Sequence, residues 1–249
     1  MNLFDSYRKQ VENCISANGD AICKLSENIE PITIINKNCF LMERDTAIEL
    51  GGYPKESINL IVPANADDEA ASPYGDGIYY IGDLDAAMDG HCSFGKIVIL
   101  WADDIPDEKL YDFTQAQLMT DVGIRMENVM LRQSPNHYQI NMRVGKEAIN
   151  SGFTIPRMGR TIYDAFAQME HVRAVTVIML VGDNPLYKKL YPLAEKIKEL
   201  SLALNHILDG IEMDCASCEQ SVVCDEINEV RALHRRSVRY VEACDLLYQ

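Results

Sequence analysis

Two long apolar runs in the middle of the chain constrain its fold more than any other feature. Residues 96–101 and 173–181 are nearly continuous stretches of apolar residues, the pattern of strands that are buried on both faces. Each run precedes a segment with helical signals: Pro106 and the acids after it open a helix extending to about Gly123, and another helix is expected over residues 184–208. Such strands need helices to cover them, so the sequence predicts an α/β fold.

Shorter segments continue the alternation of strands and helices. An opening helix is expected to bury Phe4, Tyr7, Val11 and Ile15 on one face and to end near Gly19. The other expected strands are 32–35, 46–50, 59–62, 77–81, 129–132 and 138–144, the other expected helices are 146–150 and 156–169, and 64–77 is expected to be a long exposed loop. Together these elements predict an α/β class with a mixed sheet flanked by helices. We expect an N-terminal helical segment (1–30), an α/β domain (31–210) and a helical tail bearing cysteines (211–249).

Composition excludes several classes of protein. The 249 residues are 47% hydrophobic and 24% charged, which is ordinary for a globular protein, and no apolar run is long enough to span a membrane. The formal charge of −15 repels phosphate backbones, so nucleic acid is not an expected partner. A local exception is the basic stretch 231–239, which is either a solvated helix face or a contact for an anionic partner. Eight cysteines are too few for a disulfide scaffold, and the first residues contain no apolar signal core, so we expect a cytoplasmic protein with reduced thiols.

Three cysteines near the end of the chain carry the strongest chemical signal. Cys215, Cys218 and Cys224 form a C-x2-C-x5-C run, in which two thiolates can bind one metal centre from a single turn and a third can close over it. A [4Fe–4S] cluster is the favoured ligand, with a zinc ion or no metal at all as the alternatives. Cys244 is the nearest candidate for a fourth ligand. A straight helix between Cys224 and Cys244 would place it about 30 Å away, so a turn is required.

The remaining cysteines and the single tryptophan are expected to be structural. A lone cysteine usually packs as a small apolar residue, which applies to Cys14, Cys23, Cys39 and Cys92. Trp101 ends a buried strand, where ligand sites of α/β proteins tend to lie, but packing in the core is the favoured interpretation. No nucleotide-binding glycine motif is present, and no histidine has a sequence neighbour that would indicate a catalytic triad.

The order of several short motifs resembles the acetyl-CoA synthase subunit of the CO dehydrogenase/acetyl-CoA synthase complex. The motifs are RDTAIELGG (44–52), GKIVI (95–99), AINSGF (148–153) and CASC (215–218). The similarity is collinear from about residue 40 to 224. The resemblance implies that this chain contains a counterpart of that enzyme's middle α/β domain, followed by the start of its metal-cluster domain.

The resemblance implies an iron–sulfur site without its nickel neighbour. In acetyl-CoA synthase the clustered cysteines bind a [4Fe–4S] cubane bridged to a two-nickel unit, whose outer nickel is held by Cys-Gly-Cys. Cys215, Cys218 and Cys224 match the first three cluster cysteines, although the family spaces the second and third farther apart. This sequence contains no Cys-x-Cys, so no nickel pair is expected. We therefore expect an accessory, electron-transfer or maturation component of one-carbon or corrinoid metabolism, with a CO dehydrogenase-like or corrinoid protein as partner.

Coenzyme A is a further candidate ligand of the α/β domain. Arg132, Arg143, Arg157 and Arg160 offer phosphate contacts if they converge, although the charge of −15 opposes general attraction of that anion. Two other functions stay open: an enzyme of unknown reaction with a cluster-containing active site, and a metal-free interaction module in which the cysteines only pack.

Overall fold

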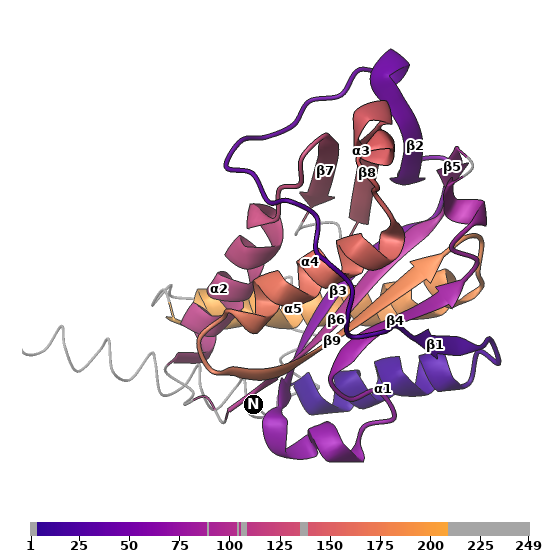
Figure 1. Ribbon diagram of the computed structural model, residues 1–249. Coiled ribbons are helices and arrows are strands. Elements are labelled where there is room, and N and C mark those ends of the chain that lie inside the picture. Colours follow the sequence, from indigo (N-terminus) through magenta and orange to yellow (C-terminus); the bar gives the residue numbers. More distant parts are fainter. Residues whose placement is uncertain (1–3, 89, 104, 106–108, 135–138, 209–249) are drawn as a thin grey trace, which may run out of the picture.

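The computed structural model describes residues 4–88, 90–103, 105, 109–134 and 139–208, which form two sheets and their covering helices (Figure 1). The helices are α1 (Asp5–Ser16), α2 (Leu110–Gly123), α3 (Lys146–Asn150), α4 (Ile155–Ala167) and α5 (Leu186–Leu208). The strands are β1 (Ile22–Lys24), β2 (Thr46–Gly51), β3 (Ser57–Asn65), β4 (Gly77–Gly82), β5 (His91–Cys92), β6 (Phe94–Ala102), β7 (Val129–Ser134), β8 (Gln139–Gly145) and β9 (Val172–Val181). Short 3₁₀ helices occupy Glu43–Asp45, Ala66–Ala71 and Ala86–Met88.

The larger sheet has five strands in the order β1-β4-β9-β6-β3. β4 and β9 are parallel, as are β3 and β6, whereas the central pair β6 and β9 is antiparallel. β6 and β9 are the two apolar runs, and all nine residues of β6 are buried. The sequence therefore identified the centre of the sheet correctly, because only strands covered on both faces need such continuous apolar sequences.

Helices cover both faces of this sheet. On one face, α1 and α5 contact β3 and each other, and Gly95 of β6 lets Tyr187 of α5 approach, since a Cβ at Gly95 would lie 3.2 Å from the tyrosine ring. On the other face, α4 contacts β4 and β9, and a Cβ at Gly159 would lie 2.7 Å from Met179. α2 contacts α4 and covers the same face of the sheet, where its Asp121 binds Lys96 of β6. The result is a three-layer α/β/α arrangement.

The smaller sheet has four strands in the order β5-β2-β8-β7, and α3 follows β8 beside it. Ile48, Leu50, Met142 and Val144 alternate with polar neighbours along β2 and β8 and are buried. Glu49 and Arg143 occupy the other face, which is only half-buried. This alternation is typical of a sheet with one face on the core and one face toward solvent.

The expected α/β class is confirmed, and several details differ from the sequence prediction. The predicted mixed pairing of strands is confirmed, but the strands form two mixed sheets instead of one. Residues 32–35 make only an isolated bridge, Ile34 to Met126, and 64–77 contains a 3₁₀ helix and the buried Tyr74 instead of a continuous exposed loop. The opening helix is confirmed with all four predicted apolar residues buried, and it shares one hydrophobic core with α5. The cysteine-bearing tail lies outside the described residues.

Candidate functional site

The described cysteines lie in separate elements. Cys14 is in α1, Cys23 in β1, Cys92 in β5, and Cys39 precedes β2; all four are free and partly buried. Burial raises the pKa of the Cys39 and Cys92 thiols. Within the described ranges, no group of three or more His, Cys, Asp or Glu side chains is arranged to hold a metal ion.

The predicted metal ligands Cys215, Cys218, Cys224 and Cys244 all lie outside the described residues. The last described element before them is α5, which ends at Leu208. The metal-site prediction therefore stays a prediction that rests on the spacing of these cysteines.

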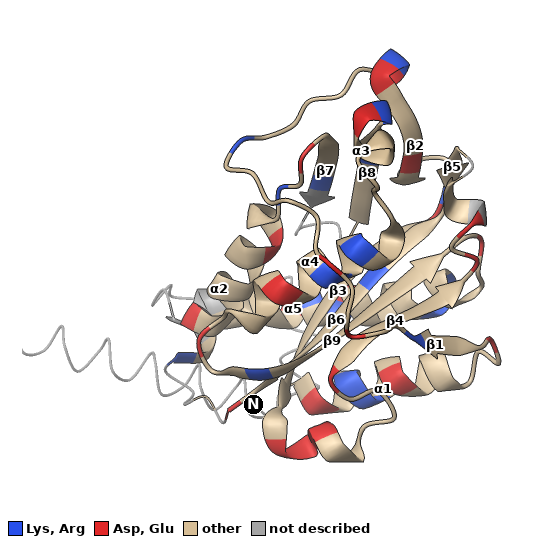
Figure 2. Ribbon diagram, in the orientation of Figure 1, with Lys and Arg blue, Asp and Glu red and all other residues tan. Residues whose placement is uncertain are grey.

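Arg132 and Arg143 lie on adjacent strands of the smaller sheet. Met130 is directly opposite Arg143 in the β7–β8 pair, so Arg132, two residues from Met130, projects from the same face as Arg143. Arg143 forms an ion pair with Glu49 at 3.3 Å. Figure 2 shows the basic segment of β7, whose single basic residue is Arg132. The sheet thus brings these two predicted residues together.

A polar row crosses the half-buried face of the smaller sheet. His91, Glu49 and Arg143 are register partners on β5, β2 and β8, and Asn141 donates a hydrogen bond to Glu49 at 3.0 Å. Burial alone would raise the pKa of Glu49, but the hydrogen bond from Asn141 and the charge of Arg143 lower it below its ordinary value. His91 contacts the carbonyl oxygen of Gly51 at 2.9 Å. These contacts hold β5, β2 and β8 in register.

Arg157 and Arg160 lie one turn apart on α4 and have partners within the protein. Arg157 donates to the backbone carbonyls of Gly152, at 2.8 Å, and Pro31, at 3.2 Å. Arg160 pairs with Asp164 at 2.8 Å and lies over the Tyr163 ring at 5.1 Å. Coenzyme A phosphates would therefore compete with existing partners at Arg143, Arg157 and Arg160.

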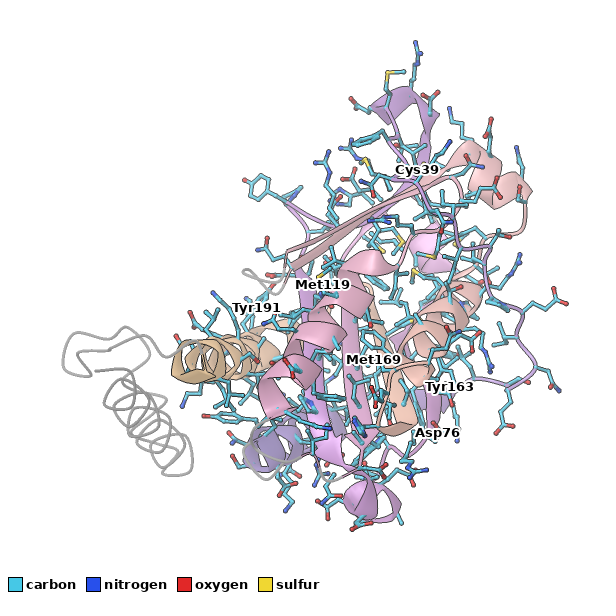
Figure 3. All side chains as sticks on the ribbon, turned by 90° about the vertical axis from the view of Figure 1, so that its left-hand side faces the viewer. Cys39, Asp76, Met119, Tyr163, Met169 and Tyr191 are labelled. Carbon is cyan, nitrogen blue, oxygen red and sulfur yellow. The ribbon has the colours of Figure 1, made fainter. Side chains whose placement is uncertain are left out.

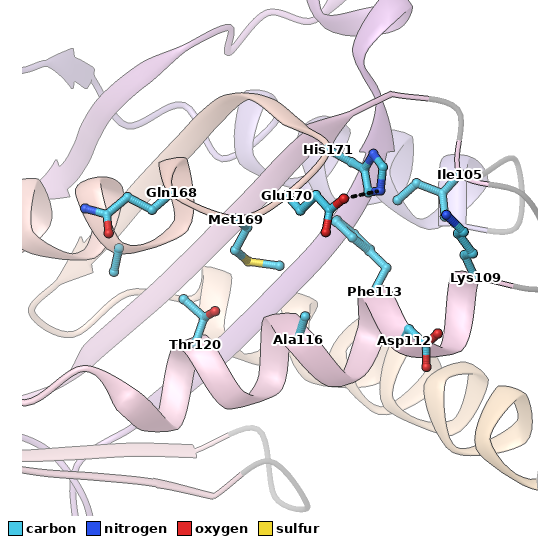
Figure 4. Close-up of a pocket in the computed structure, with 11 residues that line it drawn as sticks. Ile105, Lys109, Asp112, Phe113, Ala116, Thr120, Gln168, Met169, Glu170 and His171 are labelled. Atoms are coloured by element: carbon cyan, nitrogen blue, oxygen red, sulfur yellow. Dashed lines mark ion pairs between the residues drawn. The ribbon is translucent and has the colours of Figure 1, made fainter.

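A pocket of about 590 Å3 lies between α2 and the end of α4, and we call it the α2–α4 pocket (Figure 4). α2 contributes Asp112 and Phe113 to its wall, and the turn after α4 contributes Met169 and His171. The pocket combines apolar walls with groups of both charges, which is the composition of many small-molecule sites.

His171 holds an uncommon backbone conformation at this pocket. Its φ is 68°, in the left-handed region that few non-glycine residues adopt. Its carbonyl accepts the Asp103 N–H at 2.9 Å, and its Nε2 lies 3.5 Å from Glu170, an ion pair that exists only when the imidazole is protonated. Strained backbone at a pocket points to a functional role.

A buried ion pair joins α2 to the larger sheet. Lys96 of β6 is fully buried and its Nζ binds the Asp121 carboxylate, which also accepts a hydrogen bond from Asn59 of β3 at 2.8 Å. Burial lowers the pKa of Lys96, because the charge of Asp121 offsets only part of the lost hydration. Gln117 lies one turn before Asp121 and is also buried. These buried polar contacts fix the end of α2 against β3 and β6.

Sequence reasoning missed this pair, although half of its signal was visible. A lysine at the start of an otherwise apolar buried strand needs an anionic partner. The partner lies 25 residues later on a helix, and nothing in the sequence distinguishes Asp121 from the other acids of that region. Trp101, by contrast, is fully buried and its Nε1 donates to Thr176 at 2.8 Å, which confirms its expected role in core packing.

Comparisons with known proteins do not assign this chain to a family. No protein-family model matches the chain, and no curated protein matches its sequence. Among the described helices, none combines the length and apolar character needed to cross a bilayer.

Proposed function

We propose that this chain is an iron–sulfur protein whose α/β body carries a [4Fe–4S] cluster on Cys215, Cys218 and Cys224. The observation that carries the proposal is the spacing of these thiols, which suits three ligands of one metal centre. The run begins shortly after the end of α5 at Leu208, so the cluster would lie close to the body along the chain.

The positions of the other thiols support this choice of ligands. The four described cysteines belong to different segments, and the described ranges contain no competing group of metal ligands. A cluster on this chain would therefore depend on the C-terminal run. Its fourth ligand would come from Cys244, a partner subunit or an exogenous group.

An accessory role follows from the resemblance to acetyl-CoA synthase together with the missing nickel ligands. Low-valent nickel needs soft thiolate ligands, and the sequence has no Cys-x-Cys to supply them. We therefore propose electron transfer or maturation in one-carbon or corrinoid metabolism, with a CO dehydrogenase-like or corrinoid protein as partner. Coenzyme A at the four predicted arginines would have to displace the existing partners of three of them.

Anaerobic purification with metal analysis tests the cluster. We expect iron and acid-labile sulfide together with absorbance at about 400 nm, lost in Cys215→Ser, Cys218→Ser or Cys224→Ser. Cys14→Ser is the matched control, because Cys14 lies within α1, and it should keep the colour. Cys244→Ser tests the fourth ligand. Stoichiometric zinc without iron would contradict the proposal, and so would CO/acetyl-CoA exchange by the nickel-reconstituted chain.

Ligand binding or catalysis at the α2–α4 pocket is a second candidate function, favoured by the backbone of His171. A ligand-observed NMR screen of small metabolites against the full chain tests it. Asp112→Asn keeps the shape of the pocket and removes one charge from its wall. Hits that persist unchanged in this variant and in His171→Asn would count against a site here.

A further inference from the structure

A second pocket, which we call the β7 pocket, lies beside the outer edge of the smaller sheet. Its volume is about 350 Å3, near the lower end of the range for small-molecule sites. One side is β7, an edge strand, and the other sides are the segment around Cys39 and the residues at the end of α2. Figure 3 views this side of the molecule, with Cys39 labelled near the smaller sheet and Met119 on α2.

Two arginines line the β7 pocket, and both differ from the other arginines of the body. Arg125 and Arg132 have no ion-pair or hydrogen-bond partner for their side chains within the described ranges, and the Nε of Arg125 is buried. All other described arginines have such a partner: Arg8, Arg44, Arg143, Arg157, Arg160 and Arg173. Although the chain has a formal charge of −15, the part that the structure describes provides no partner for these two guanidinium groups at one cavity.

A buried guanidinium N–H without an acceptor is unfavourable for folding. An anion in the pocket would pair with the guanidinium groups of both arginines, which have no partner among the described residues, and a guanidinium fork suits a planar carboxylate. The charge of −15 opposes a dianion more strongly than a monoanion, so a monocarboxylate fits the surroundings better than a phosphate.

The pocket also presents apolar surface beside these charges. Phe40 is 82% exposed and Val122 is 45% exposed, and both line the pocket. Met119, one turn before Val122 on α2, is 71% exposed. These side chains offer exposed apolar surface at the pocket and next to it, against which an apolar ligand group can pack. The Cys39 thiol has a raised pKa because it is buried, so it stays neutral and does not repel an anion.

We propose that the β7 pocket binds a small organic monocarboxylate, with the carboxylate on Arg125 and Arg132 and the apolar portion against Phe40 and Val122. Binding is non-covalent. This inference is independent of the iron–sulfur proposal, because none of these residues belongs to the cysteine run.

Isothermal titration calorimetry of the full chain with sodium hexanoate tests the proposal. We expect a dissociation constant below about 1 mM, with inorganic phosphate and the uncharged analogue 1-hexanol binding at least tenfold more weakly. Absence of hexanoate binding up to about 10 mM would overturn the proposal. Tighter binding of phosphate would overturn the assignment of a carboxylate, and equal binding of 1-hexanol would show that the arginines contribute nothing.

Substitutions separate the role of the arginines in binding from any role in folding. Arg132→Met, at an exposed position, should weaken hexanoate binding at least tenfold without lowering the melting temperature. Arg125→Met should also weaken binding tenfold, and its melting temperature should be unchanged or higher, because the unpaired buried N–H is removed. Arg173→Met, whose partner Asp103 lies elsewhere, is the matched control and should bind like the wild type. Unchanged hexanoate binding in both Arg125→Met and Arg132→Met would refute the site.

Discussion

Removing the ammonium group of Lys96 should be among the most damaging single changes in the body of the protein. Lys96→Met keeps a side chain of similar length in the same buried space but leaves the Asp121 carboxylate in the core without its cation. Asp121→Leu removes the anion instead and leaves the fully buried ammonium group of Lys96 without this carboxylate. Both changes break the contact that fixes the end of α2 on β6.

The expected costs follow from the burial of the pair. Breaking a buried ion pair by removing one partner costs about 3–5 kcal/mol, a large share of the roughly 5–15 kcal/mol of a typical domain. The double variant Lys96→Met/Asp121→Leu replaces the pair with apolar groups, a change that is often neutral or stabilising. It also removes the acceptor of Asn59, at a cost of about 1 kcal/mol. We therefore expect the double variant within about 2 kcal/mol of the wild type, and a coupling energy of at least roughly 4 kcal/mol.

Denaturant unfolding followed by tryptophan fluorescence measures these values. Trp101 is the single tryptophan and is fully buried in β6, the strand that also carries Lys96, so its emission reports the loss of the central sheet. Lys188→Met, at an exposed position of α5, is the control and should change stability by less than about 0.5 kcal/mol. The reasoning is refuted if Lys96→Met costs less than about 1 kcal/mol, or if the double variant loses the sum of the single costs.

Two further predictions concern backbone conformation and pH. His171→Gly should raise the melting temperature slightly, since glycine adopts φ 68° without the steric cost of a side chain; a clear loss of stability would show that the imidazole itself stabilises the turn. Burial and the hydrogen bond to Asp76 raise the pKa of Tyr163 to about 12, so this residue contributes stability that is present below pH 10 and is lost as the pH rises toward 12. Tyr163→Phe should remove that part of the alkaline decline in thermal melts, and an unchanged pH profile would contradict the assignment.

The sequence predicted the individual elements better than their assembly. β6 and β9 are apolar along most of their lengths, and α1 buries its apolar residues at helical spacing, so local patterns were sufficient for these elements. β1 and β5 have three and two residues, too few to show any period. The division into two sheets depends on pairings between strands far apart in the chain, which local patterns do not encode.

The candidate sites show the same limit. The C-x2-C-x5-C run is a local pattern and was visible at once. The β7 pocket arises because the connection from α2 to β7 carries Arg125, and β7 itself carries Arg132, to one cavity beside the segment around Cys39. The sequence indicates Arg132 as a candidate anion ligand, but the significance of Arg125 appears only when the partners of the described arginines are compared.

The contact between α1 and α5 has a consequence for folding during synthesis. Asn18, just after α1, donates a hydrogen bond to Asn184, just before α5 and 166 residues later. At about 5–20 residues per second, a ribosome needs roughly 8–33 s to make that stretch. Until then the apolar side of α1, with Phe4 and Val11, lacks its final neighbour and is exposed to other chains. The chain should therefore depend on chaperones during translation, and a circular permutant that makes α1 directly after α5 should aggregate less as it is synthesised.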